Sequence, residues 1–276
     1  MTQTMINDSE LKARHRAMWA LGDYSAVASE VVAELGQTLV SVVGPQPGER
    51  VLDVAAGSGN VALPAAALGA RVTASDLTPE LLDAGRRQAV ASALDIAWET
   101  GGAEALPYAD GDFDVTTSCV GVMFAPHHQA AADELVRVTR SGGRLGLIAW
   151  TPAGFIGQMF AVMKPYLPPP PPDASPAPLW GDPDYVRSLL GDRVRDLNCT
   201  PRQLRVTQFR TPAAFRDYFK TNYGPTIAAY RGLADQPERQ VALDRDLVEL
   251  ARRFDIGETG ETVMDWEYLL VTARVR

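Results

Sequence analysis

The stretch VLDVAAGSGNVALP, residues 51–64, runs from an apolar segment through a glycine-rich turn into helix-forming residues. A glycine-rich turn between a strand and a helix exposes backbone N–H groups and the positive end of the helix dipole, which together bind an anion. The pattern fits dinucleotide-binding proteins, yet Asp53 places a carboxylate in a strand that is usually apolar in them. The anion is therefore a pyrophosphate or the carboxylate of an amino-acid-like ligand, and the glycines alone leave both open.

Outward from this turn, residues 50–150 alternate short β-rich runs with helical segments. Thr78 is expected to cap a helix with Pro79 in its first turn, and Gly142-Gly143 to end another helix. This alternation predicts right-handed crossovers and a parallel sheet covered by helices on both faces. The predicted strands are 50–54, 71–75, 95–99, 113–120 and 144–150, and the predicted helices include 60–68 and 129–140.

The sequence changes character after Trp150. Five consecutive prolines, Pro168–Pro172, must be extended and are excluded from a sheet interior, so we interpret them as a rigid surface connection within an insertion. Two more predicted strands bring the sheet to seven. These strands are 202–209 and 263–274, and the accompanying helices are 11–21, 212–222 and 237–254.

The fold class is therefore α/β: a doubly wound, mostly parallel seven-stranded sheet of the Rossmann-like kind, in one domain that spans residues 1–276. Its expected parts are an N-terminal helical lid, a cofactor-binding core, a Pro-rich cap inserted after the fifth strand, and a C-terminal part that completes the sheet and the substrate pocket. These parts are residues 1–36, 37–152, 153–201 and 202–276, respectively.

Composition excludes several classes of function. The net charge of −8 provides no broad basic field for a nucleic acid. Cys119 and Cys199 make no disulfide framework and lack the clustering of a metal site, so we expect no metal and a reducing cytoplasmic setting. No secretion signal and no run of about 18 apolar residues occurs, so we expect no membrane insertion.

Two aspartates narrow the choice of ligand. Asp76 ends the second predicted strand, where a carboxylate can accept hydrogen bonds from both hydroxyls of a ribose. Its alternative role is to cap the next helix, but Thr78 is already expected there. Asp53 either meets a ligand ammonium group or bonds loop amides, and both remain open. A ligand with an ammonium, a carboxylate and an adenosine is S-adenosylmethionine.

Three segments resemble the successive motifs of class I S-adenosylmethionine-dependent methyltransferases, in particular the quinone-methyltransferase-like small-molecule group. They are ERVLDVAAGSGNVALPAAALGARVTASDLTPELLDAGR (49–86), GGAEALPYADGDFDVTTSCVGVMFAP (101–126) and ELVRVTRSGGRLGLIAWTP (134–152). The resemblance covers residues 48–152, and AMWALGDYSAVA (17–28) is more weakly similar to a segment that folds over the cofactor. It implies a Rossmann-like methyltransferase core with S-adenosylmethionine as cofactor.

The resemblance also implies residue roles. Two departures from the family pattern are Gly102, where relatives often carry an Asp that accepts from the adenine amino group, and Ala55 in place of the first loop glycine. Trp19 and Tyr24 are implied lid residues, although ordinary core packing would look the same. The other implied roles are Asp53, Ala55, Gly57 and Gly59 around the methionine end, Asp76 at the ribose, Leu77 beside the adenine, Ala103 and Glu104 at the adenine edge, and Cys119 and Val120 under the reactive centre.

The expected reaction is methyl transfer to a small, largely apolar or aromatic molecule. His127, just after the fourth strand, is the preferred base and His128 the second choice, against the alternative that both are solvated; His15 is expected at the surface. Two other functions remain open: an NAD(P)-dependent oxidoreductase and a non-catalytic S-adenosylmethionine-binding relative. The expected substrate walls are Phe155, Met159, Phe160, Met163, Trp180, Tyr218 and Tyr223, and the oligomeric state is open.

Overall fold

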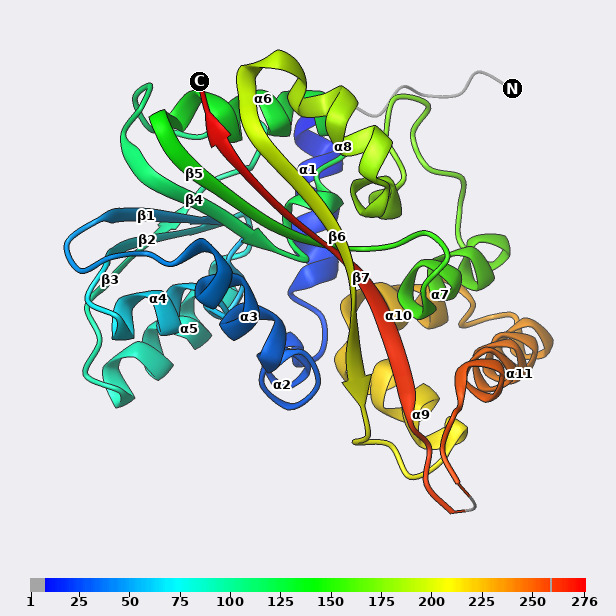
Figure 1. The fold of residues 1–276 in the computed structure, drawn as a ribbon. Coiled ribbons are helices and arrows are strands. Elements are labelled where there is room, and N and C mark those ends of the chain that lie inside the picture. The colour runs from blue at the N-terminus through cyan, green and yellow to red at the C-terminus, as the bar shows by residue number, and fades with distance from the viewer. Residues whose placement is uncertain (1–7, 259) are drawn as a thin grey trace.

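The computed structural model describes residues 8–258 and 260–276, so residues 1–7 of the expected lid lie outside the described part. Within that part, seven strands form one sheet in the order β3-β2-β1-β4-β5-β7-β6 (Figure 1). The strands are β1 (Arg50–Val54), β2 (Arg71–Asp76), β3 (Ile96–Thr100), β4 (Phe113–Cys119), β5 (Thr139–Trp150), β6 (Val194–Val206) and β7 (Met264–Val275).

The predicted fold class is confirmed. Strands β1 to β5 pair in parallel, and β7 lies antiparallel between β5 and β6. The order reverses at β1, which pairs with β2 on one side and β4 on the other. In an open sheet of this kind, ligands bind outside the carboxyl ends of the strands at such a reversal.

Helices cover both faces of the sheet. Figure 1 shows α3, α4 and α5 on one face and α6 and α8 on the other. The longer helices are α1 (Asp8–Trp19), α3 (Ala33–Val43), α5 (Pro79–Ala91), α6 (His128–Val138), α9 (Pro212–Asn222) and α11 (Pro237–Phe254), and the shorter ones are α2 (Tyr24–Glu30), α4 (Ala62–Ala67), α7 (Phe155–Met163), α8 (Pro183–Leu190) and α10 (Gly224–Gly232).

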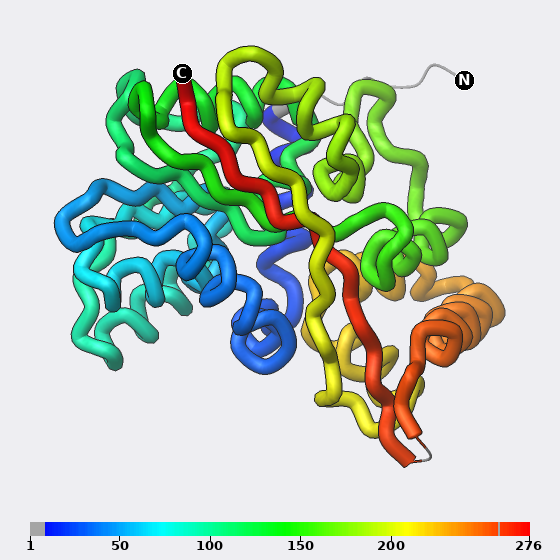
Figure 2. The backbone as a smooth tube through the Cα atoms, in the orientation of Figure 1, coloured from blue at the N-terminus to red at the C-terminus, as the bar shows by residue number. Residues whose placement is uncertain are grey.

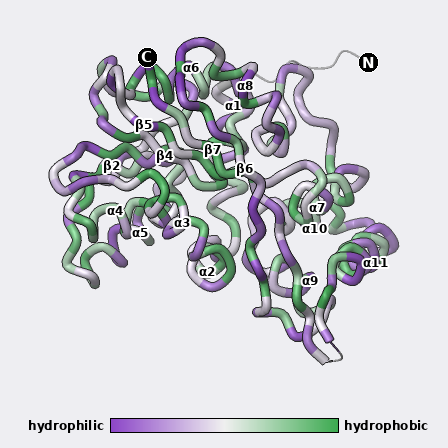
Figure 3. The backbone as a smooth tube through the Cα atoms, in the orientation of Figure 1, coloured by the Kyte–Doolittle hydropathy of each residue, from purple (hydrophilic) through white to green (hydrophobic). Residues whose placement is uncertain are grey.

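The central strands carry the core because both of their faces are covered. Figure 3 shows hydrophobic residues along β4, β5 and β7, whereas much of β6 is hydrophilic. β6 is an edge strand, and Pro201 is tolerated there because an edge position leaves its missing N–H without consequence. The later half of β7 has Thr272 and Arg274 on a less buried face, as its alternation predicts.

The junction between α6 and β5 differs from the prediction. Gly142-Gly143 do not end the helix, since α6 ends at Val138 and β5 begins at once with Thr139. Gly142 has a φ of 74°, which only glycine adopts readily, and the pairing of β4 with β5 shifts register there. The glycines therefore form an irregularity inside the strand rather than a helix end.

The C-terminal strands extend beyond the sheet into a second group of helices. Figure 2 shows β6 and β7 running side by side from the sheet into this region. There α7, α9 and α11 pack on one another, and α7 and α11 also contact β7. We call α7, α9, α10 and α11 with the adjoining halves of β6 and β7 the C-terminal lobe.

Two of the three expected part boundaries fall inside elements, and the third, at 152, lies between β5 and α7. Residue 36 lies within α3, and β6 begins at Val194, inside the expected cap of residues 153–201. That segment divides: α7 joins the C-terminal lobe, whereas α8 packs on α6 beside the sheet. No single helix in the described ranges is long and apolar enough to cross a membrane, although α2 and α3 together pass on length and composition with a 64° bend between them.

Candidate cofactor and substrate site

A cavity of about 890 Å³, its open mouth included, lies at the carboxyl ends of β1 to β4. It is lined by the residues that follow each of these four strands and is covered by α1 and α2. The cavity therefore occupies the edge at which the order of the strands reverses.

The glycine-rich turn after β1 forms the floor of the cavity. Ala55 and Gly57 line it, both with positive φ angles of 53° and 56°. The turn is held against its neighbours: the N–H of Ala56 donates to Ser75 O at 3.0 Å, and a Cβ added to Gly121 would lie 2.5 Å from Ala55 O. Gly59 does not line the cavity; an added Cβ there would lie 2.7 Å from the Trp98 ring.

Asp76, at the end of β2, is buried to 8% exposure and lines the cavity. Its Oδ2 accepts a hydrogen bond from Gly57 N at 2.8 Å and its Oδ1 from Thr78 N at 2.7 Å. Thr78 takes the N-cap position of α5 with Pro79 in its first turn, as expected, but its side chain makes no cap bond. Burial raises the pKa of Asp76, against the hydrogen bonds that lower it.

Asp53 is 1% exposed and is not among the residues that line the cavity. Its Oδ2 accepts from Ala62 N at 3.2 Å, in the first turn of α4, and its Oδ1 from Thr117 Oγ1 at 3.1 Å. Burial raises the pKa of Asp53 to about 7. These contacts match neither of the two roles left open, a ligand ammonium or loop amides: they tie β1 to the first turn of α4 and to β4.

The end of β4 brings a second strained turn to the cavity. Cys119 and Val120 both line it, and Val120 has a φ of 45°, which is rare for a β-branched residue. Burial raises the pKa of the Cys119 thiol, which keeps it protonated. Ala55 and Val120 are two of the four non-glycine residues with positive φ in the described part of the chain, and such strain concentrates at functional sites.

Residues 101–104, after β3, border the opposite end of the cavity. The Glu104 carboxylate joins two elements: its Oε1 accepts from His127 N at 2.7 Å, and its Oε2 lies 2.9 Å from the Lys12 ammonium of α1. A Cβ added to Gly102 would meet no atom within 4 Å. The missing side chain at this position therefore leaves open space.

Aromatic side chains close the cavity over the ends of β1 and β4. Trp19 and Tyr24 line it together with Phe124. The Trp19 ring lies 4.7 Å from that of Phe124, 5.4 Å from that of Tyr24 and 5.7 Å from that of Tyr223, in edge-to-face arrangements. Trp19 and Tyr24 therefore combine the two roles left open for them, because their rings both pack on other aromatic rings and face the cavity.

The three histidines do not have the surroundings that the sequence predicts for them. His127 does not line the cavity, and its N–H is committed to Glu104, so the geometry gives no support to a base at this position. His128 is 1% exposed, with ring nitrogens 3.1 Å from Tyr185 Oη and from Met123 O, and its pKa is lowered to about 4 by burial. The expectation that His128 is solvated is wrong. His15, expected at the surface, lines the cavity.

Comparison with known proteins identifies the family. Residues 52–147 match a family model described as a methyltransferase domain. An uncharacterized protein of Mycobacterium tuberculosis is 52% identical over 269 residues, 98% of this chain and 97% of that protein. The ubiquinone/menaquinone biosynthesis C-methyltransferase of Zymomonas mobilis is 38% identical over 106 residues, 38% of this chain and 44% of that enzyme.

The chain belongs to the class I S-adenosylmethionine-dependent methyltransferases. It is an enzyme, and S-adenosylmethionine is its cofactor. The fold agrees, since the YcgJ protein of Bacillus subtilis superposes with a TM-score of 0.60 at 17% identity, over 88% of this chain and 98% of that one. The oxidoreductase hypothesis is thereby overturned.

The residues present in this methyltransferase fit such a cofactor. The turn at 55–58 and the Asp76 carboxylate meet in one cavity, and the space beside Gly102 continues it toward β3. All of the expected cofactor residues except Asp53 and Gly59 line it. Those that do are Trp19, Tyr24, Ala55, Gly57, Asp76, Leu77, Ala103, Glu104, Cys119 and Val120.

Several cavity residues of the methyltransferase were not expected from the sequence. Most of them neighbour an expected residue, as Ser58, Thr78 and Gly121 do. For α1, the spacing of residues could have predicted two of them. Lys12 and His15 stand seven and four residues before Trp19, so they share one helix face with this expected lid residue. The further unexpected lining residues are Ala28, Ala56, Asn60, Leu81, Gly101, Gly102, Val122, Phe124 and Ala125.

Most of the expected substrate walls are core. Phe155, Met159, Met163 and Trp180 are fully buried and do not line the cavity. Phe155 stacks at 5.0 Å on Trp266 inside the C-terminal lobe. The other three expected residues lie elsewhere. Phe160 and Tyr223 contact rings that line the cavity, since Phe160 is 5.9 Å from Phe124 and Tyr223 packs on Trp19. Tyr218 donates a hydrogen bond to Glu30 at the surface.

Proposed function

We propose that this methyltransferase binds S-adenosylmethionine in the cavity at the ends of β1 to β4 and transfers its methyl group to a small, largely apolar or aromatic molecule. The cavity itself carries the proposal. Backbone turns and the Asp76 carboxylate form its floor, and the aromatic rings of Trp19, Tyr24 and Phe124 form its roof. A polar seat under an apolar cover suits a polar cofactor beside an apolar acceptor.

The proposed seat follows the edge of the sheet. The turn at 55–58 takes the carboxylate of the methionine end through its backbone N–H groups. Asp76 accepts hydrogen bonds from the ribose hydroxyls, and Leu77 with residues 101–104 borders the adenine. Asp53 acts indirectly, because it ties β1 to the first turn of α4 and so fixes the glycine turn.

The proposed chemistry is an in-line displacement. The cofactor supplies a methyl group already activated by its sulfonium. As the acceptor atom forms its bond to the methyl carbon, the carbon–sulfur bond breaks and its electron pair stays on sulfur. The protein chiefly positions the reactants and excludes water, and positioning of this kind supplies about 7–11 kcal/mol in well-aligned systems.

The lining favours an uncharged acceptor. Beside the end of β4 the cavity wall is apolar or neutral, since burial raises the pKa values of both the Cys119 thiol and the Tyr24 phenol. The net charge of −8 supports a small acceptor rather than a nucleic acid. Both cysteines are free, which supports a reducing compartment and hence the cytoplasm.

Binding and turnover test the proposal together. We expect S-adenosylhomocysteine to bind the wild-type chain with micromolar affinity by calorimetry and to raise its melting temperature. Asp76→Ala removes the ribose partner and frees the Gly57 N–H, so the affinity should fall by at least about tenfold. Asp83→Ala, at an exposed position on α5, is the matched control.

A panel of phenols, quinones and carboxylic acids with labelled S-adenosylmethionine then tests for transfer. We expect label in one or more apolar aromatic members and none with Asp76→Ala. An unchanged affinity in Asp76→Ala would refute the proposed seat. Label confined to the polar, charged members would refute the proposed acceptor class.

A further inference from the structure

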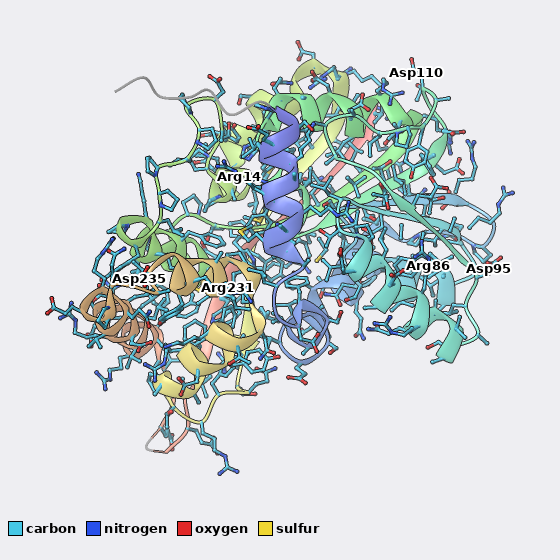
Figure 4. All side chains as sticks on the ribbon, turned by 180° about the vertical axis from the view of Figure 1, so that it is seen from behind. Arg14, Arg86, Asp95, Asp110, Arg231 and Asp235 are labelled. Atoms are coloured by element: carbon cyan, nitrogen blue, oxygen red, sulfur yellow. The ribbon has the colours of Figure 1, made fainter. Side chains whose placement is uncertain are left out.

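α1 lies across the cavity with three side chains on one face. Lys12, His15 and Trp19 follow the i, i+3, i+7 spacing of a helix face, and all three line the cavity. Figure 4 shows α1 running between the sheet and the C-terminal lobe, with Arg14 labelled on it. One helix face therefore spans the length of the proposed cofactor seat.

The two ends of this face meet different parts of the seat. Lys12 forms its 2.9 Å ion pair with Glu104, which follows β3. Trp19 packs 4.7 Å from Phe124, which follows β4. His15 stands one turn from each end, and the Glu104 charge acts on it. α1 thus places His15 toward the β3 end of the cavity, away from the reactive centre.

The β3 end of the cavity has open space, but few polar side chains there are available to hydrogen-bond a ligand. Gly102 offers no side chain, and the space beside it is empty for 4 Å around an added Cβ. Glu104 Oε1 accepts from His127 N, and Oε2 is paired in charge with the Lys12 ammonium at 2.9 Å although it accepts no hydrogen bond from the described part of the chain. In contrast, the His15 ring makes no hydrogen bond with any residue that the structure describes.

The His15 ring is suited to accept a hydrogen bond. Burial lowers its pKa below the usual 6.5, although the Glu104 carboxylate opposes this effect. The imidazole is therefore neutral at pH 7, with one nitrogen that donates and one that accepts. A neutral imidazole can therefore accept a hydrogen bond from an aromatic amino group.

We propose that His15 recognises the adenine of the cofactor, with its unprotonated ring nitrogen accepting a hydrogen bond from the 6-amino group. The inference rests on the proposed seat, in which Asp76 holds the ribose and the base extends from β2 toward residues 101–104. The lid helix, rather than the loop after β3, then supplies the polar side chain that selects adenine. Cofactor recognition and lid position are coupled through one residue.

The test compares two ligands on the complete chain. S-adenosylhomocysteine carries the 6-amino group, and its 6-deamino analogue, with purine in place of adenine, lacks it. Calorimetry on wild type, His15→Phe and Arg14→Ala gives the ratio of the two dissociation constants for each protein. His15→Phe keeps a ring in the wall but removes both nitrogens, whereas Arg14→Ala changes an exposed neighbour on the same helix.

We expect wild type and Arg14→Ala to bind S-adenosylhomocysteine about tenfold more tightly than the analogue, which is the effect of one hydrogen bond. In His15→Phe the ratio should fall to near one. The ratio cancels any general loosening of the lid, since that weakens both ligands alike. A tenfold ratio that persists in His15→Phe, or a wild-type ratio near one, overturns the inference while leaving the proposed seat intact. Failure of wild type to bind either ligand overturns the seat itself.

Discussion

At the scale of single residues, two buried carboxylates organise the floor of the site. Asp53 accepts one hydrogen bond from the first turn of α4 and one from Thr117 of β4, and Asp76 accepts two at the cavity edge. Neither has a cation as partner among these contacts, so burial dominates and raises the pKa of both. Folding therefore shifts both carboxyl groups toward the protonated form, relative to the unfolded chain.

This shift makes stability depend on pH. With a folded pKa of about 7 against the usual 3.8, Asp53 holds a proton in the folded state that the unfolded chain has released between these pH values. Its contribution to the free energy of unfolding is therefore complete below about pH 4 and is lost as the pH rises toward 7, with a slope of up to about 1.4 kcal/mol per pH unit. Asp53→Asn removes this part of the slope. Urea unfolding of both proteins at pH 5, 6, 7 and 8 measures it; parallel curves would contradict the assignment.

At the scale of elements, the position of α1 depends on its two ends. One end is fixed by the Lys12 pair with Glu104. The other passes through Gly22, which has a φ of 69°, and packs on the first turn of α10, where a Cβ on Gly224 would overlap Met18 O. Since α1 carries His15 and Trp19, its packing on α10 sets how the cavity is covered.

Gly224→Ala should therefore weaken cofactor binding through the lid. The added methyl forces α1 away from α10, a displacement of the kind that costs about 1–3 kcal/mol in a packed interface. We expect the dissociation constant of S-adenosylhomocysteine to rise by about tenfold in calorimetry. Gly232→Ala, at the other end of α10, meets no atom within 4 Å and is the control. Equal affinities in the two variants would show that the α1–α10 contact does not govern the site.

At the scale of the whole molecule, the site is assembled from distant parts of the chain. The cavity joins the ends of four strands to α1, and Trp19 of α1 contacts Tyr223 at the start of α10 in the C-terminal lobe. A ligand bound there contacts segments that have no common surface in the unfolded chain. Binding should therefore stabilise the folded state as a whole.

The size of this stabilisation is predictable. At a free concentration one hundred times its dissociation constant, S-adenosylhomocysteine should add about 2.7 kcal/mol to the free energy of unfolding. For a chain of this size the melting temperature then rises by about 5–10 °C. Differential scanning calorimetry with S-adenosylhomocysteine and with NAD at the same concentration measures it, and NAD should have no effect. A comparable rise with NAD would contradict the specificity of the seat.

The alternation of residues 50–150 determined the parallel sheet, and the order of Asp76 and the glycine turn placed the site at one edge. These features are local, because strand ends and turns follow from short-range patterns and the right-handed crossover fixes their common edge. Only the tertiary structure decided which side chains face the cavity. His15 proved to line it and His128 to be buried, and Phe155 joined the core of the C-terminal lobe. The reason is that a helix face acquires its partner from segments far away in the sequence, and the spacing of residues within the helix does not specify that partner.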